Sequence, residues 1–113
     1  MAVPATPAQA WEDYLFLTRE MDKFLTSQDF DMFTELAGQR EKLQAIIEEM
    51  ASRDYLRTPR GQEIAAAVRK QDKAMQDKLL LLINKTRQDR TVTQAYDLYG
   101  AAMKLGSRMD SSR

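Results

Sequence analysis

The chain of 113 residues contains no cysteine and no histidine. Without cysteine it has no disulfide bonds and no thiolate chemistry, as is usual for proteins of a reducing compartment. The usual metal-ligand spacings and a glycine-rich phosphate loop are also missing. Carboxylate pairs such as Glu48-Glu49 stand beside basic residues, as on a solvated helix face. We therefore expect no catalytic residue, no cofactor and no metal site.

Long apolar runs are absent as well. The longest, Ile64–Val68 and Leu79–Ile83, are five residues, whereas a membrane-spanning helix needs roughly 20. The N-terminal residues 1–7 have neither a basic start nor an apolar stretch typical of a secretory signal. We therefore expect a cytoplasmic protein that does not insert into a membrane.

Neither sign of charge is in excess, because 17 Lys and Arg balance 17 Asp and Glu. A nucleic-acid-binding protein of this size usually carries a basic excess that neutralises phosphates, so this class is disfavoured. Hydrophobic residues make up 43% and charged residues 30%, which fits neither a disordered nor a membrane protein. The length suits a single domain over residues 1–113.

Two stretches repeat apolar residues at alternating steps of three and four. Such spacing places side chains on one face of a helix, and over two heptads it favours helices packed lengthwise, as in a coiled coil. A cation interrupts the first stripe and an anion the second. The first stripe consists of Phe33, Leu36, Arg40, Leu43, Ile47 and Met50, and the second of Ala65, Val68, Asp72, Met75, Leu79, Leu82 and Thr86.

Capping signals delimit the helices. Thr6-Pro7 and Thr58-Pro59 each offer a capping side chain followed by proline at the first helical position. Alternation that would indicate a sheet is absent. The prediction is an all-α fold, an antiparallel bundle of three main helices plus a short C-terminal fourth helix. The expected helices cover residues 7–26, 30–53, 59–90 and 92–104, with a connection at 54–57 and a disordered tail at 106–113.

Arg40 and Asp72 form the predicted polar seam of the bundle. Short turns place neighbouring helices antiparallel, which leaves the two charges about three residues apart along the bundle axis. An arginine side chain spans that distance, so we expect Arg40 to be buried against Asp72, Gln71 or a ring of the first helix. Two interpretations stay open, a structural ion pair that sets the helix register and a polar switch.

A mutase-like enzyme is an alternative. Small helical mutases grip dicarboxylates with Arg, Lys, Asp and Gln inside a bundle, which draws attention to Arg40, Gln71, Asp72 and Lys78. One cation in the stripe is too few to neutralise a dianion in a closed pocket. We therefore do not expect an enzyme.

The apolar side of the third helix has two interpretations. Its stripe is either plain core or a groove that another helix covers, and Leu80, Leu81 and Ile83 add a second apolar face. The final helix carries its own stripe and is either a fixed bundle helix or a lid that a client helix displaces. The hypothetical partner-binding groove consists of Val68, Met75, Leu79, Leu82, Tyr96, Tyr99 and Met103, with Val92 beside the last three.

Four segments within residues 11–99 follow one another in an order that is typical of a known protein family. The second helix has an aromatic residue near its start and an internal Gln-Arg followed by leucine, and a small residue precedes a tyrosine after the third helix. In this respect the chain resembles the flagellar type III export chaperones of the FliT kind, with FlgN-like chaperones as the second choice. The segments are Asp29-Phe30-Asp31-Met32-Phe33-Thr34-Glu35-Leu36, Gln39-Arg40-Glu41-Lys42-Leu43, Gln71-Asp72-Lys73 leading into Leu79-Leu80, and Gln94-Ala95-Tyr96.

The resemblance implies a cytoplasmic chaperone in bacterial flagellum biogenesis. Such a chaperone binds an aggregation-prone terminal segment of the filament-cap protein and delivers it to the export ATPase complex and the export gate. A generic helical adaptor or homodimerisation module without a secretion client is the alternative.

Overall fold

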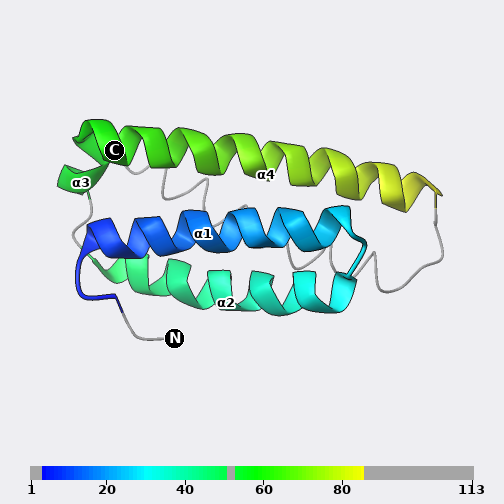
Figure 1. Ribbon diagram of the computed structural model, residues 1–113. Coiled ribbons are helices and arrows are strands. Elements are labelled where there is room, and N and C mark those ends of the chain that lie inside the picture. Colours follow the sequence, from blue (N-terminus) through cyan, green and yellow to red (C-terminus); the bar gives the residue numbers. More distant parts are fainter. Residues whose placement is uncertain (1–3, 51–52, 86–113) are drawn as a thin grey trace.

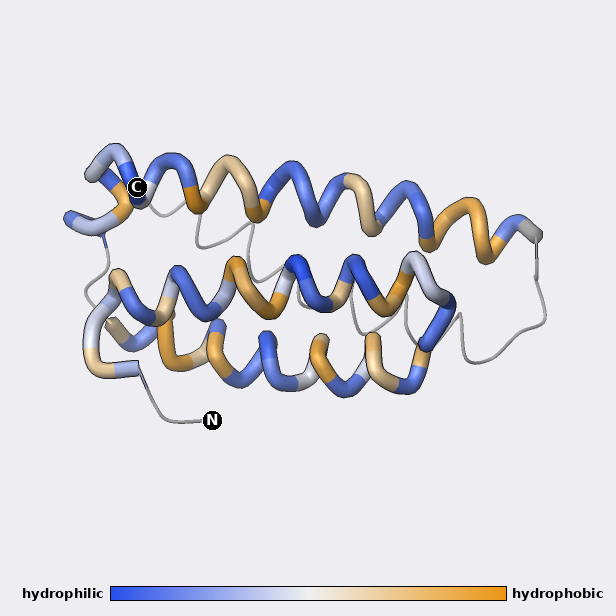
Figure 2. The backbone as a smooth tube through the Cα atoms, viewed as in Figure 1, coloured by the Kyte–Doolittle hydropathy of each residue, from blue (hydrophilic) through white to orange (hydrophobic). Residues whose placement is uncertain are grey.

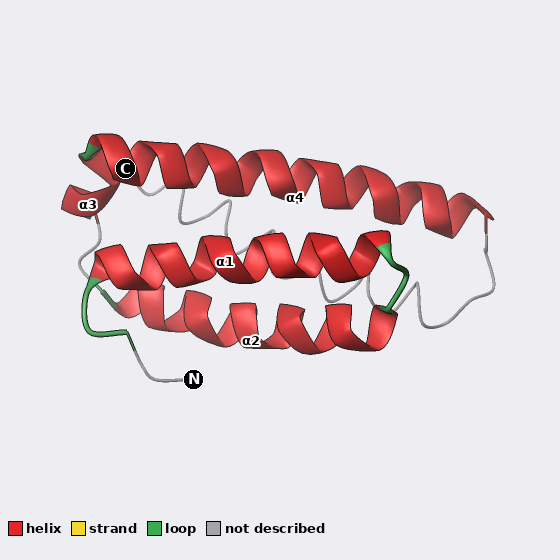
Figure 3. Cartoon of the chain, in the orientation of Figure 1, coloured by secondary structure: helices red, strands yellow, loops and turns green. Residues whose placement is uncertain are grey.

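The computed structural model describes residues 4–50 and 53–85, which form four helices. These are α1 (Pro7–Thr26), α2 (Phe30–Glu49), α3 (Arg53–Arg57) and α4 (Pro59–Lys85). No strand occurs among the described residues (Figure 3). The prediction of an all-α helical bundle is confirmed. The expected fourth bundle helix at 92–104, the tail at 106–113 and the last residues of the 59–90 helix lie outside the described residues.

Helix α1 lies between the two other long helices. Helices α2 and α4 each pack along it, and α3 packs on α4 (Figure 1). The chain runs along α1, returns along α2, and then follows α4 in the direction of α1. Side chains from α2 and α4 therefore meet beside α1, which positions the polar residues described below.

Backbone hydrogen bonds fix the turn between α1 and α2. Gln28 adopts a left-handed conformation with φ of 60°. The amide of Asp29 donates to the carbonyl of Phe24 at 2.9 Å, and that of Gln28 donates to Leu25 at 3.0 Å. This is a Schellman arrangement, which satisfies the last carbonyls of a helix. The Asp29 carboxylate then accepts from the amide of Met32 and caps α2, so the two helices reverse direction over three residues.

The second helix ends earlier than the sequence predicts. The expectation was a helix over 30–53 followed by a connection at 54–57, but α2 ends at Glu49 and residues 53–57 are helical. Met50 is extended, with φ of −85° and ψ of 147°. Leaving the helix there allows Tyr55 and Leu56 of α3 to pack against the core, where both are partly buried. Tertiary packing therefore overrides local helix propensity.

Gly61 allows α3 to approach the first turn of α4. A Cβ atom at this position would lie 2.1 Å from the carbonyl oxygen of Tyr55, a backbone atom that cannot move aside alone. The Gly61 amide donates to the Thr58 hydroxyl at 3.0 Å, which caps α4. The close contact between α3 and α4 therefore requires glycine at this position.

Two glycine substitutions are expected to have opposite effects. Gly61→Ala should lower the free energy of unfolding by about 1–3 kcal/mol, because α3 must shift away from α4. Gly38→Ala is the matched control in the middle of α2, where a Cβ atom meets nothing within 4 Å. It should raise the free energy of unfolding by about 0.5–1 kcal/mol through helix propensity. Urea unfolding measures both, and equal effects would contradict the close contact at Gly61.

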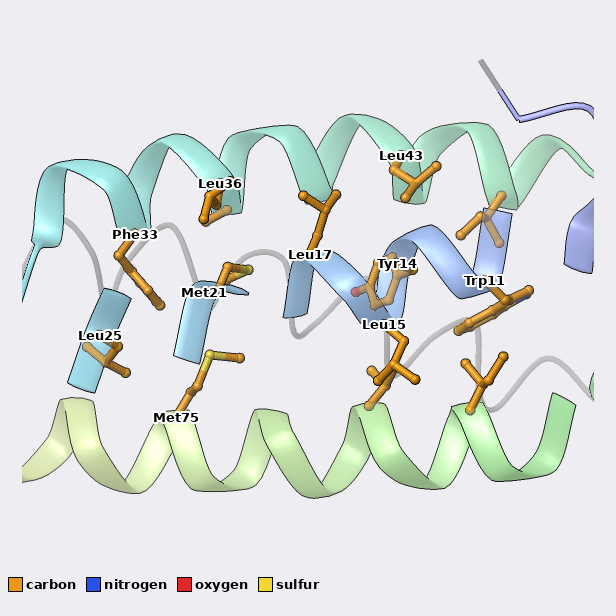
Figure 4. Close-up of a cluster of buried hydrophobic side chains, with 14 of the residues drawn as sticks. Trp11, Tyr14, Leu15, Leu17, Met21, Leu25, Phe33, Leu36, Leu43 and Met75 are labelled. Carbon is orange, nitrogen blue, oxygen red and sulfur yellow. The ribbon is translucent and has the colours of Figure 1, made fainter. Parts of the chain in front are cut away.

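The core is one buried cluster along the length of α1. Buried apolar residues of α1, α2 and α4 form it, and hydrophobic and hydrophilic positions alternate along these helices (Figure 2). Phe33 of α2 and Met75 of α4 are fully buried, and both point toward α1 (Figure 4). Helix α1 contributes Trp11, Tyr14, Leu15, Leu17, Met21 and Leu25 to this cluster.

Candidate functional site

Arg40 lies at the centre of the bundle. This α2 side chain has an exposed fraction of 0%, and its Nη1 atom donates to Asp72 Oδ1 of α4 at 2.7 Å. The same atom donates to Thr18 Oγ1 of α1 at 3.0 Å. The guanidinium carbon also lies 5.0 Å from the centre of the Tyr14 ring, within the range of a cation–π contact. One arginine thus joins all three long helices.

Further polar groups extend this site along α1 and α2. The Tyr14 hydroxyl donates to Gln44 Oε1 at 3.1 Å, and Gln44 is fully buried. The Thr18 hydroxyl donates to the Tyr14 carbonyl at 2.8 Å. Trp11 packs beside Tyr14 with ring centres 5.6 Å apart. We call Tyr14, Thr18, Arg40, Gln44 and Asp72 the buried polar cluster.

The composition of the buried polar cluster indicates a structural role. Asp72 supplies a carboxylate to Arg40, and the side chain of Asp72 is only 14% exposed. Buried charges in proteins are paired in this way because an isolated buried charge is strongly unfavourable. The Thr18 hydroxyl donates its hydrogen to a backbone carbonyl of its own helix, a common hydrogen bond of threonine within helices. The arrangement fixes which faces of the three helices meet.

The four residues of the mutase hypothesis do not converge. Arg40 and Asp72 contact each other, but the Lys78 ammonium donates to Asp22 Oδ1 at 2.6 Å and to Thr26 Oγ1 at 2.9 Å. Lys78 is thus engaged with α1 rather than with Arg40. Gln71 is partly buried on α4. This geometry gives no support to a site for a dianion.

A second ion pair joins α1 to the first turn of α4. Arg60 donates to both carboxylate oxygens of Glu12, at 2.8 and 2.9 Å, and to Glu63 at 3.1 Å. The hydrogen bond from Arg60 lowers the pKa of Glu12 below its usual value. Because both side chains are substantially exposed, solvent screens this pair. Arg60 therefore orients α4 on α1 more than it stabilises the fold.

Three residues of the predicted partner-binding groove belong to the core. Val68, Met75 and Leu79 are buried members of the core cluster, and Leu82 is partly buried against it. These side chains are covered in the structure, and their role in binding a client stays a prediction. Tyr96, Tyr99 and Met103, together with Val92, lie outside the described residues.

Sequence reasoning identified Arg40 and Asp72 but missed Gln44. Gln44 directly follows Leu43 and is not a member of the first stripe, so the heptad spacing did not predict its burial. Its only signal is its distance of four residues from Arg40, which places both on one side of α2. Thr18, in contrast, recurs at helical spacing with the buried Tyr14 and Met21 of α1.

The exposed apolar residues lie elsewhere. Leu80 is 41% exposed and Leu81 is 62% exposed, both on the last turns of α4, and Phe16 of α1 is 61% exposed. In the described part of the chain, no three acidic side chains gather in a way that suits a metal ion. Within the same residues, no helix is both long and apolar enough to cross a membrane. The exposed leucines are therefore the feature of the surface that most needs an explanation.

Comparison of the chain with protein-family models, with curated proteins and with solved structures found no match.

Proposed function

We propose that this chain is a cytoplasmic flagellar export chaperone. It binds an aggregation-prone segment of a filament-cap-type subunit and delivers it to the export ATPase complex and the export gate. The proposal draws on the resemblance of the chain to FliT-like chaperones, and the observation that carries it is the exposure of Leu80 and Leu81 on the longest helix. Adjacent exposed leucines favour a surface that binds another protein.

Three residues of the segments that resemble the family belong to the scaffold. Phe33 lies in the core, and Arg40 joins Asp72 in the buried polar cluster. Phe33, Arg40 and Asp72 therefore hold the helices together, and we propose that exposed residues such as Leu80 bind the client. The finer arrangement that we propose adds a short fourth helix at 92–104 to the three long helices.

We propose that the chain binds its client without catalysing a reaction. The polar residues that we describe in the interior hold one another, and Lys78 is engaged with α1. An active site contains a nucleophile, a base or a cation that is directed at the substrate. The described interior contains instead an ion pair whose two members contact each other. We therefore propose that the chain is not an enzyme.

Co-purification tests the proposal. The tagged full-length chain is expressed with the C-terminal segment of a flagellar filament-cap protein, and the expected result is a soluble complex that survives gel filtration. An unrelated helical segment of similar length is the control. Binding of a small dianion instead would favour the mutase alternative, and binding of neither would favour the adaptor.

A further inference from the structure

We propose that the outer face of α4 docks an acidic amphipathic helix of a partner protein, with Leu80 and Leu81 as the apolar anchors. This inference rests on the proposed function, since it names the class of segment that a client would present. The outer face of α4 is defined by Ala66, Lys70, Lys73, Asp77, Leu80, Leu81 and Asn84, which recur at helical spacing.

This face points away from the core. Ile64, Val68, Met75 and Leu79 of the same helix are buried, and α4 packs along α1 (Figure 1). Apolar residues gather at the C-terminal end of α4 (Figure 2). The inner leucine Leu79 therefore belongs to the fold, whereas its neighbours Leu80 and Leu81 are left to the surface.

Phe16 provides the contrast. It is as exposed as Leu81, but it lies singly on α1 among exposed or partly exposed residues such as Asp13, Arg19 and Glu20. Single apolar residues on a surface are common in soluble proteins and require no function. Two adjacent leucines that follow a charged stretch of one helix form a patch instead.

The charges of α4 define the partner. Residues 59–85 contain six Lys and Arg against three Asp and Glu. Arg60 and Lys78 are paired with carboxylates of α1, whereas Lys70 and Lys73 lie exposed on the outer face. Lys73 contacts only Asp77 of its own helix, at 3.5 Å and in solvent, a pair that is readily exchanged. A helix with acidic residues beside its apolar anchors complements this face.

A second copy of the chain fits the face less well. The exposed side of α2 is acidic, with Asp31, Glu35, Glu48 and Glu49, so its charge would match α4. However, the exposed large apolar side chains in the described part of the chain are Phe16, Leu80 and Leu81, and none lies on α2. A copy of α2 would thus bring charge without anchors. Two leucines are also few for docking on a lipid surface, which usually requires an apolar face along a whole helix.

Designed peptides test the inference on the full-length chain. One synthetic helical peptide carries leucines at i, i+3, i+4 and i+7 with Glu at the flanking positions, and a matched peptide carries Lys instead of Glu. Fluorescence anisotropy of labelled peptides should show binding of the Glu peptide, weakened by salt, and much weaker binding of the Lys peptide. The Leu80→Ala/Leu81→Ala variant should bind the Glu peptide at least about tenfold more weakly, because two anchors are lost.

Matched variants complete the test. Phe16→Ala removes an equally exposed apolar side chain from another face and should leave peptide binding unchanged, whereas Lys70→Glu/Lys73→Glu should reverse the preference between the peptides. Equal binding of both peptides, an equal loss in Phe16→Ala, or binding to anionic vesicles in preference to the peptide would overturn the inference. If the cap-protein segment still co-purifies with Leu80→Ala/Leu81→Ala at the level of the unchanged chain, this docking face is wrong while the proposed function stands.

Discussion

Replacing Arg40 with alanine is expected to lower the free energy of unfolding by roughly 3–5 kcal/mol, the usual range for breaking a buried ion pair. The substitution removes the hydrogen bonds to Asp72 and Thr18 and leaves the largely buried Asp72 carboxylate without its arginine. It also removes the cation beside the Tyr14 ring. Chemical unfolding followed by circular dichroism measures the change.

A double substitution separates the charge effect from packing. Replacing Arg40 with Met and Asp72 with Leu exchanges the pair for apolar side chains, which is often neutral or stabilising in other proteins. We expect this variant to be at least about 2 kcal/mol more stable than Arg40→Ala, because no buried charge is left behind. A loss below about 1 kcal/mol for Arg40→Ala is the value typical of an exposed pair. Such a value would contradict the central position of Arg40.

Phe33→Ala is expected to cost about 3–5 kcal/mol of unfolding free energy, since it opens a cavity in the core. Phe33 is fully buried on α2 and points toward α1 (Figure 4). Phe16→Ala is the matched control, because the same side chain is removed from an exposed position on α1. It should change stability by less than about 0.5 kcal/mol.

Thermal and urea unfolding of these two variants test the assignment of the core. Phe33→Ala should shift the midpoint strongly, and Phe16→Ala should leave it almost unchanged. Similar losses in both variants would mean that Phe16 is covered in solution, for example by a second copy of the chain. Sedimentation of the unchanged chain at several concentrations would then detect that copy.

Periodicity predicted most of the buried face of α2. Phe33, Leu43 and Ile47 recur at heptad spacing and are buried, because a face that repeats every 3.5 residues stays turned toward its neighbours. The charge at Arg40 stood in the same stripe, and a cation at a core position predicts a buried partner. Asp72 is that partner in the structure.

Tertiary packing decided what the sequence did not indicate. Residues 48–53 contain no glycine or proline to end a helix, so the break at Met50 reflects the packing of Tyr55 and Leu56 rather than a local signal. A stripe likewise shows that a face is buried without showing what covers it. For this reason Met75 and Leu79 were candidates for a groove, although they belong to the core.

The sequence also does not show which leucines of α4 are exposed. Leu79, Leu80, Leu81 and Leu82 are chemically alike, and only the rotation of α4 on α1 determines which of them reach solvent. The contacts of Arg60 and Lys78 with α1 fix this rotation at the surface of the bundle. The contact between Arg40 and Asp72 fixes it in the interior. The position of the docking face therefore depends on the polar contacts of the bundle.

Isothermal titration calorimetry tests most directly the central claim that this chain is an export chaperone that binds a protein segment. The full-length chain is titrated with the purified C-terminal segment of a flagellar filament-cap protein, and with succinate as a small dianion in a parallel experiment. We predict saturable binding of the segment and no heat of binding from succinate. Saturable binding of succinate together with no binding of the segment would contradict this claim.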